Sequence, residues 1–481
     1  MKNNKGITLV ALVVTIVVLL ILAGVSINLV LGDNGIIAKA KEAETKSAEA
    51  SQNDLKGMNS LVSEMEGALA GNGSTGSGSG NGGAGGSGTD TKVPAEATAE
   101  TAPYFPDNTF TKKEGKIDTG LVIQDASGNE YVWVVVPRTT AVYKKTGLGK
   151  TTFTDTDYTN IETDLQNYTS TYRYGTSYSD TWAADTDNVG WLTSDEYTEL
   201  KNKMLKSVYL NGGFYVGRYE AGIAENRTSE GPTNSDGKYT IAEMPAPVSK
   251  ADAYPYTYVT RTQAQNLASK VNAGTKTSSL MFGLQWNLVL AFMHNKGNIA
   301  DSTLTSNSTT IGNYRDSVFQ LSQTGQYAVF SNFSLSSTWN PSTTATKNFV
   351  DSSRNKLAES GGNGILVTTG TSETNKVMNI YDIAGNVYEW TLELTSYADG
   401  PCACRGGCFH TTGSNSPAAS RGSDSTGLSN NLIGFRVSLS RKSWMLETRN
   451  LKQEEKIKMI TESYKKAHAL HSEWNTLCGK F

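Results

Sequence analysis

The chain has 481 residues, of which 19% are charged, and its formal net charge is −3 at pH 7. This slightly acidic balance offers no cationic surface for phosphates, so we expect no nucleic-acid partner. Of the 4 cysteines, most lie in the segment 402–408, and this pattern excludes the disulfide framework of a small secreted domain. The length allows about two or three domains.

The N-terminal region contains an uncharged apolar stretch from Ile7 to Leu31, preceded by Lys2 and Lys5. A helix over this stretch is about 37 Å long at a rise of 1.5 Å per residue, enough to cross the ~30 Å hydrocarbon core of a bilayer. The positive-inside rule keeps the two lysines cytoplasmic and places Asp33 and everything after it outside. We predict a single-pass cell-membrane protein with an extracellular C-terminal region.

The residues Lys5-Gly6-Ile7-Thr8-Leu9-Val10 resemble a type IV prepilin leader, which is cut after the glycine. The resemblance implies processing between Gly6 and Ile7 and contact with pilin-type assembly machinery. Pilin subunits carry Glu at the position of Ala11, so assembly into a filament stays open while membrane anchoring is expected. A cleavable secretory signal is the alternative, but its apolar region would be shorter and would end in a small-x-small site.

The composition changes several times along the chain. Residues 71–90 are almost wholly Gly, Ser, Thr, Asn and Ala, which predicts a flexible coil with an r.m.s. span of about 25 Å. The expected organisation is a leader and transmembrane helix at 1–35, a helical stalk at 36–70, a flexible linker at 71–112, a folded domain at 113–441 and an appended charged helix at 442–481. In the last segment His468 and His471 could contact one metal ion, but a solvated helix face is favoured because no acid or cysteine has a fixed place beside them.

Local patterns predict several elements of the folded domain. Residues Ile117 to Arg138 alternate and then become continuously apolar, which predicts a hairpin ending in a buried strand. The capping boxes Thr193-Ser-Asp-Glu196 and Thr260-Arg-Thr-Gln263 predict two helix starts. The long polar segment 298–374 is predicted to form surface loops.

The segment from Tyr381 to Trp390 constrains the domain most. Asp382 and Glu389 flank a Gly-Asn turn, and Gly385 permits a backbone conformation that directs carbonyl groups inward. Oxygen ligands in this arrangement suit calcium. A buried turn whose carboxylates accept hydrogen bonds from backbone amides is the equally supported alternative.

The same segment begins a set of motifs in a characteristic order. They are Asp382 to Trp390 with the pattern D-x-x-G-N-x-x-E-W, Arg405-Gly406-Gly407, and Gly434-Phe435-Arg436-Val437. Together they resemble the formylglycine-generating-enzyme (sulfatase-modifying-factor) domain. Upstream, Gly213 to Glu220 resembles the family's early strand, and Leu280 to Asn295 resembles its central helix. The resemblance covers residues 117–440 and implies an α+β, loop-rich fold of the C-type-lectin-like kind.

This resemblance also implies particular ligands. In the family a structural calcium ion is held at positions that correspond to Asp382, Gly385, Val387 and Glu389. The copper-binding cysteines of the oxidase correspond to Thr411 and Ser416, whose hydroxyls cannot hold a cuprous ion.

No catalytic residue is therefore assigned, and the sequence favours a domain without the oxidase chemistry. The related sulfoxide synthases hold iron with histidines, and the chain has only 4 of these. A soft metal on Cys402, Cys404 and Cys408 stays open beside the simpler interpretation as reduced thiols.

The polar run 410–431 is the candidate ligand-binding loop, because short adaptable side chains on a rigid frame suit recognition. An ordinary solvent loop is the alternative. The candidate residues are His410, Thr411, Thr412, Ser414, Asn415, Ser416, Ser420, Ser423, Asp424, Ser425, Asn430 and Asn431. A loop of this kind, ahead of G-F-R, also resembles the ligand-binding proteins diversified by retroelements.

These observations predict a membrane-tethered, outward-facing protein that binds an extracellular protein or glycan. A surface metal-dependent oxidoreductase of the same superfamily is the alternative function.

Overall fold

The computed structural model describes residues 94–441, apart from 96, 174–176 and 272–275. The predicted transmembrane helix, stalk, most of the linker and the C-terminal helix lie outside the described residues. Among the helices that are described, none combines the length and apolar character needed to cross a bilayer. The described part is a mixed α and β, loop-rich structure.

The largest sheet has six antiparallel strands in the order β1-β2-β3-β5-β20-β8. The strands are β1 (Thr111–Glu114), β2 (Val122–Gln124), β3 (Glu130–Val135), β5 (Gly213–Gly217), β20 (Val437–Arg441) and β8 (Lys276–Leu280). The predicted hairpin is confirmed as β2 and β3, which pair through Val122 and Val132. Trp133 of β3 is fully buried, as expected for the continuously apolar strand.

The helices of the described residues are α3 (Asp155–Tyr168), α4 (Ser194–Asn211), α5 (Arg261–Lys270), α6 (Gly283–Asn295) and α7 (Asp301–Thr305), with 3-10 turns at Ile117–Thr119, Ser170–Tyr172 and Glu373–Asn375. Helices α4, α5 and α6 contact the six-stranded sheet. Both predicted capping boxes are confirmed at the starts of α4 and α5. Helix α4 packs on β5 and β20, and α6 packs on β3. Helix α3 was not predicted from the sequence, although Thr154 and Asp157 form a capping box at its start.

The second sheet carries the characteristic motifs. Its strands are β18 (Arg421–Asp424), β17 (Cys402–Arg405), β16 (Tyr388–Thr395) and β19 (Ile433–Phe435), and β4 (Tyr178–Ser179) also pairs with β16. Strands β16 and β19 are parallel and the other neighbours are antiparallel. The polar run 410–431 is therefore not one continuous loop, because its residues 421–424 pair with β17 as an edge strand.

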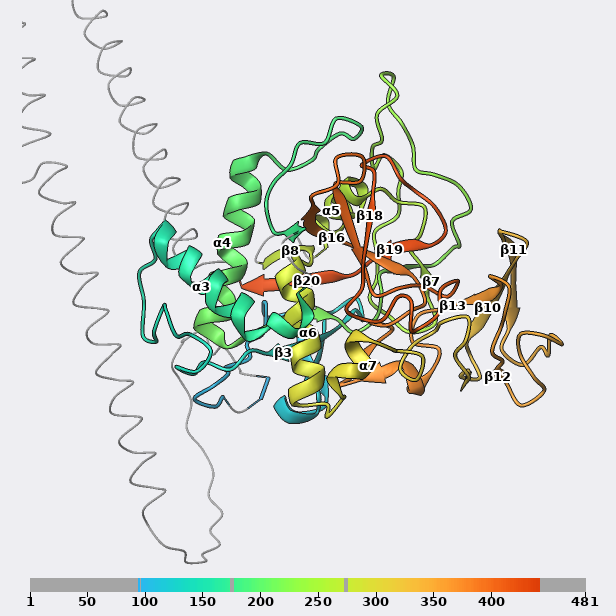
Figure 1. Ribbon diagram of the computed structural model, residues 1–481, viewed down its shortest axis with the longest axis horizontal. Helices are drawn as coiled ribbons and strands as arrows, with labels where there is room; N and C mark the ends of the chain where they lie inside the picture. The colour runs from blue at the N-terminus through green and yellow to red at the C-terminus, as the bar shows by residue number, and fades with distance from the viewer. Residues whose placement is uncertain (1–93, 96, 174–176, 272–275, 442–481) are drawn as a thin grey trace, which may run out of the picture. The chain divides into compact units, whose positions relative to one another are not determined.

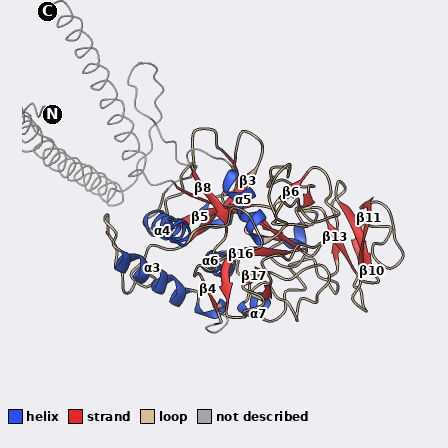
Figure 2. Cartoon of the chain, turned by 90° about the horizontal axis from the view of Figure 1, so that it is seen from above, coloured by secondary structure: helices blue, strands red, loops and turns tan. Residues whose placement is uncertain are grey.

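The expectation of surface loops over 298–374 is wrong for much of that segment. It contains α7 and a sheet of β10 (Gln326–Ser331), β11 (Ser334–Pro341) and β13 (Gly364–Val367). This sheet covers a small core of its own, formed by Phe319, Leu321, Tyr327, Val350, Ile365 and Val367. Figures 1 and 2 both place it at the opposite end of the folded region from α3 and α4.

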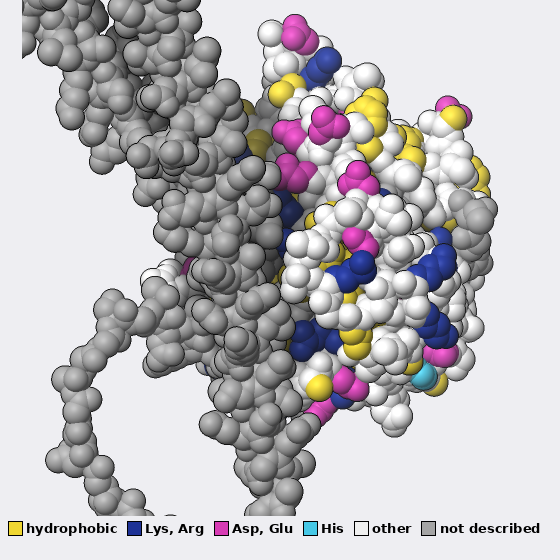
Figure 3. Space-filling model, turned by 90° about the vertical axis from the view of Figure 1, so that its left-hand side faces the viewer, with side chains coloured by type: hydrophobic (Ala, Val, Ile, Leu, Met, Phe, Trp, Pro, Cys, Tyr) yellow, Lys and Arg dark blue, Asp and Glu magenta, His cyan; other side chains and the backbone are white. Residues whose placement is uncertain are grey.

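Short strand pairs complete the structure. They are β6 (Gly222–Ile223) with β7 (Tyr254–Pro255), β9 (Phe319–Gln320) with β12 (Asn355–Lys356), and β14 (Lys376–Val377) with β15 (Ile380–Tyr381). On the face that Figure 3 shows, basic and acidic side chains are interspersed among uncharged polar surface.

Arg436 joins the two larger sheets. Its guanidinium is fully buried and donates to both carboxylate oxygens of Glu389, at 2.6–3.2 Å. It also donates to the carbonyl oxygen of Gly217 in β5 at 3.0 Å and to that of Tyr381 in β15 at 2.9 Å. One side chain thus connects the six-stranded sheet, the second sheet and the strand that precedes the Gly-Asn turn.

Candidate functional site

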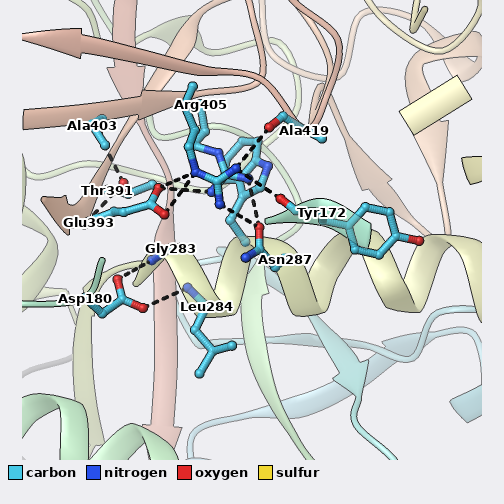
Figure 4. Close-up of polar contacts among 12 residues, drawn as sticks. Tyr172, Asp180, Gly283, Leu284, Asn287, Thr391, Glu393, Ala403, Arg405 and Ala419 are labelled. Carbon is cyan, nitrogen blue, oxygen red and sulfur yellow. Dashed lines mark hydrogen bonds and ion pairs between the residues drawn. The ribbon is translucent and has the colours of Figure 1, made fainter. Parts of the chain in front are cut away.

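A buried network of charges supports the end of the polar run (Figure 4). Glu393 of β16 accepts hydrogen bonds from two guanidinium groups, that of Arg405 at 3.2 Å and that of Arg421 at 3.0 and 3.1 Å. Both arginines also donate to the side-chain oxygen of Asn287 in α6, at 3.0 and 3.2 Å. Helix α6 and strands β16, β17 and β18 are therefore held at one point.

At the R-G-G motif the chain leaves this network, because Gly406 and Gly407 directly follow Arg405. Gly406 and Gly407 have φ of +88° and +78°. A Cβ atom on Gly407 would lie 2.3 Å from the carbonyl oxygen of Ser416, so only glycine fits. The Nε atom of Arg405 donates to the carbonyl oxygen of Ser420 at 3.1 Å, which fixes where the chain returns to the sheet.

Asp180 lies beside the same network at the start of α6. Its carboxylate accepts from the backbone N–H groups of Gly283 at 2.7 Å and Leu284 at 2.9 Å. Burial, together with the negative charges of Glu393 and Glu162, raises the pKa of Asp180 to about 7. This carboxyl group is therefore partly protonated near neutral pH.

A pocket of about 410 Å³ lies beside this network of buried charges and has Arg421 in its lining. It is lined by Thr171, Tyr172, Arg173, Tyr178, Thr305, Ser306, Ser414, Asn415, Pro417, Ala419, Ser420 and Arg421. Its lining therefore combines two arginines with hydroxyl, amide and phenol groups and contains no carboxylate. The Oγ atom of Ser420 is buried and has no hydrogen-bond partner among the described residues.

The structure brings only part of the predicted ligand-binding set into this pocket, namely Ser414, Asn415 and Ser420. Ser416 is buried instead, and its hydroxyl lies 2.9 Å from that of Tyr388. Thr411 donates to the carbonyl oxygen of Cys408 at 3.0 Å.

The remaining members of the set lie outside the pocket lining. The ring of His410 packs against that of Phe330, with centroids 4.8 Å apart. Ser423 and Asp424 belong to β18, whereas Thr412, Ser425, Asn430 and Asn431 lie in turns and loops.

Sequence reasoning missed the side of the pocket formed by residues 171–178 and 305–306. Arg173 is half-buried, and its Nη1 atom donates to the side-chain oxygen of Gln166 at 3.1 Å. A lone arginine in the Ser, Thr and Tyr-rich stretch 167–179 was the available signal. The stretch is far from the motifs in sequence, so its position could not be derived from them.

The predicted calcium ligands lie in a crowded, fully buried turn. Asp382 accepts from the backbone N–H of Gly370 at 3.0 Å and from the side-chain amide of Asn375 at 3.4 Å. Both oxygens of Glu389 are paired with Arg436. Across the described ranges, no group of three or more His, Cys, Asp or Glu side chains is arranged to hold a metal ion. In this structure Arg436 is the partner of Glu389, and calcium binding by this turn stays a prediction.

A third carboxylate, that of Glu220, faces the same turn. It accepts from the side-chain amide of Asn386 at 2.6 Å and from the backbone N–H of Val387 at 3.3 Å. Burial and the charges of Asp382 and Glu389 raise the pKa of Glu220 well above its usual range. Burial also raises the pKa of Asp382 to about 6. Three buried carboxyl groups thus surround the single guanidinium of Arg436.

The cysteines of the second sheet are reduced and buried. Cys402, Cys404 and Cys408 form no disulfide. Burial raises the pKa of each thiol, to about 11 for Cys402 and Cys408. Such thiols are inert in comparison with reactive, partly exposed cysteines.

The characteristic motifs lie within a recognised family domain. Residues 323–441 match the family described as "Sulfatase-modifying factor enzyme 1-like domain". The chain therefore contains a domain of the sulfatase-modifying-factor class, as the motifs at 382–390, 405–407 and 434–437 predicted. The part of the predicted resemblance over residues 117–322 lies outside this match.

Comparisons with solved structures give distant similarities. One is "Crystal Structure of CarF", with 12% identity, a TM-score of 0.28 and coverage of 48% of this chain and 87% of that chain. Another is "Treponema denticola variable protein 1", with 11% identity, a TM-score of 0.22 and coverage of 73% and 94% respectively. TM-scores this low bear on neither the site nor the function. No curated protein matches the chain.

The Glu389–Arg436 pair leads to a prediction about stability. Glu389→Gln should lower the free energy of unfolding by about 3–5 kcal/mol, because it breaks the buried ion pair in which Arg436 donates to both Glu389 oxygens. Urea unfolding of the full chain measures this loss. Glu199→Gln is the control, since Glu199 forms an exposed pair with Lys203 and should change stability by at most about 1 kcal/mol.

The same variant tests the calcium prediction. A calcium ion must displace Arg436 from an oxygen of Glu389, and binding would stabilise the wild type by about 2.7 kcal/mol at a hundredfold excess over Kd. If the ion binds, the unfolding midpoint of the wild type rises with calcium and falls with chelator, and Glu389→Gln removes this response. Equal midpoints with calcium and with chelator would leave Arg436 as the partner of Glu389.

The surplus of carboxylates leads to a prediction about pH. Because the folded-state pKa of Glu220 is raised, its contribution to stability is present below about pH 4.5 and is lost as the pH rises through the folded-state value. Glu220→Gln removes this loss. Relative to wild type, the variant should gain up to about 1.4 kcal/mol per pH unit across that window. The exposed control Glu225→Gln should give a profile of unfolding free energy against pH that is parallel to that of the wild type. A Glu220→Gln profile that is also parallel to that of the wild type would contradict the prediction.

Proposed function

We propose that this chain is a membrane-anchored, outward-facing binding protein without the oxidase chemistry of its domain class, and that its ligand occupies the 410 Å³ pocket. The pocket carries the proposal, because it joins residues 414–421 of the polar run to a rigid base of paired charges. Adaptable polar side chains on such a base suit recognition. A volume in this range is typical of a small-ligand site.

The two positions that carry copper ligands in the family support a binding role. The hydroxyl of Thr411 is bonded to the backbone of Cys408, and that of Ser416 to Tyr388. Hydroxyls in these roles hold the loop in place, and they offer none of the soft ligands that a cuprous ion requires. The alternative, a metal-dependent oxidoreductase, would need a metal elsewhere in the chain.

Blocking the pocket tests the proposal. Labelled full-length protein is applied to a glycan array and to an array of extracellular proteins. Ser414→Trp places an indole at the rim and should reduce binding to any authentic ligand at least tenfold. Ser235→Trp is the matched control, since Ser235 is exposed and lies outside both the pocket lining and the polar run 410–431, and it should bind as wild type does.

Two outcomes would overturn the binding role. One is the absence of any ligand whose binding responds to Ser414→Trp. The other is stoichiometric copper or iron in the purified chain together with catalytic turnover.

The anchor is tested separately. We expect prepilin peptidase to cut between Gly6 and Ile7 and to leave the protein in the membrane through residues 7–31. Mass spectrometry of the membrane fraction should then find Ile7 as the N-terminus, and Gly6→Leu should prevent the cut. An intact Met1 terminus in the mature wild type, or recovery of all the protein in the medium, would contradict the anchor.

A further inference from the structure

We propose that the pocket recognises an acidic saccharide, a sugar bearing a carboxylate or sulfate group, and that Arg173 contacts the acidic group. This inference rests on the proposed binding function and specifies its ligand. It starts from the imbalance of charge around the pocket.

The base of the pocket holds more positive than negative charge. The one carboxylate of Glu393 is shared by Arg405 and Arg421, so one positive charge stays unbalanced in this trio. Of the neighbouring acids, Glu162 is paired with Lys201 at 3.0 Å. Asp180 accepts two backbone N–H groups at the start of α6 and forms no ion pair with either arginine, although its charge also acts on the Arg405 guanidinium.

Arg173 adds a second charge at the pocket wall. Its Nη1 atom donates to the neutral side chain of Gln166 at 3.1 Å, and its guanidinium forms no ion pair with a carboxylate among the described residues. Arg421, by contrast, has its donors occupied by Glu393, Asn287 and the carbonyl oxygen of Tyr172. Arg173 is therefore the guanidinium free to bind a ligand, and planar carboxylate or sulfate groups match its fork of donors.

The rest of the lining favours a sugar over an acidic peptide. Hydroxyl and amide groups of Thr171, Thr305, Ser306, Ser414 and Asn415 surround the opening. The buried Oγ atom of Ser420 has no hydrogen-bond partner in the part of the chain that the structure describes, and a ligand hydroxyl that reached it would satisfy it. The ring of Tyr178, which lies 5.3 Å from the Arg421 guanidinium, offers an aromatic surface for a sugar ring. An acidic peptide would offer carboxylate and amide groups but few hydroxyls to these side chains.

Matched ligands test the acidic group. Isothermal titration of the full chain uses tetragalacturonate against its methyl ester for the carboxylate arm, and sulfated against unsulfated maltotetraose for the sulfate arm. At least one acidic form should bind ten times more tightly than its neutral partner, and added salt should reduce this difference. The arm that responds identifies the acidic group.

Variants of Arg173 test the contact. Arg173→Gln should remove the preference for the acidic form, while Arg173→Lys should keep part of it because the charge stays without the planar fork. Both variants should unfold within about 1 °C of the wild-type midpoint, since Arg173 is half-buried and forms no ion pair among the described residues, and a single exposed polar contact contributes little to stability. Arg227→Gln is the control, because Arg227 donates to the backbone of residues 257 and 258, outside the pocket, and should leave the preference unchanged.

Several outcomes overturn the inference. They are equal binding of acidic and neutral saccharides, no binding of either acidic probe, an undiminished preference in Arg173→Gln, and equally tight binding of tetraglutamate. A neutral ligand that Ser414→Trp excludes would overturn the acidic-saccharide inference and keep the binding function. Failure of every array ligand to respond to Ser414→Trp would overturn both.

Discussion

The buried guanidinium of Arg436 is the interaction on which the arrangement of the two larger sheets depends. It follows directly after β19 and before β20, so it lies where the chain passes from one sheet to the other. Its donors reach β5, β15 and β16 at once. Arg436 bonds to one carboxylate and two carbonyl groups in the interior. Any arrangement that moved Arg436 away would cost free energy, because each partner would be left buried and unpaired. The pair therefore specifies how the strands that carry the motifs approach one another.

The turn beside this pair shows how the interior handles an excess of negative charge. Asp382, Glu389 and Glu220 are all buried around one arginine. All three carboxyl groups have raised pKa values, chiefly because burial disfavours their charged forms. A divalent cation would compensate the negative charge in a turn whose carboxylate oxygens were free. Here Glu389 already has its counter-charge, which makes Arg436 and calcium competitors for the same oxygens.

A second arginine pair supports the binding surface in a related way. Arg405 and Arg421 share Glu393, and the backbone between them forms the wall that holds Ser414, Asn415 and Ser420. Because these arginines are buried and fully bonded, they serve as structure. Arg173 lies on the opposite, non-motif segment and remains available. The pocket thus combines a rigid base with a separate charged contact, as a recognition site requires.

The sequence by itself determined the features that depend on near neighbours along the chain. The capping boxes at Thr193 and Thr260, the hairpin of β2 and β3 and the class of the domain were predictable, because each depends on a pattern within a few residues. The strands β10, β11 and β13 were not predicted. Residues of β11 are exposed or half-buried along its whole length, so no alternation marked it. Only the tertiary structure decided the partner of Glu389 and the position of Arg173, because ion pairs and pockets join segments that lie far apart in the chain.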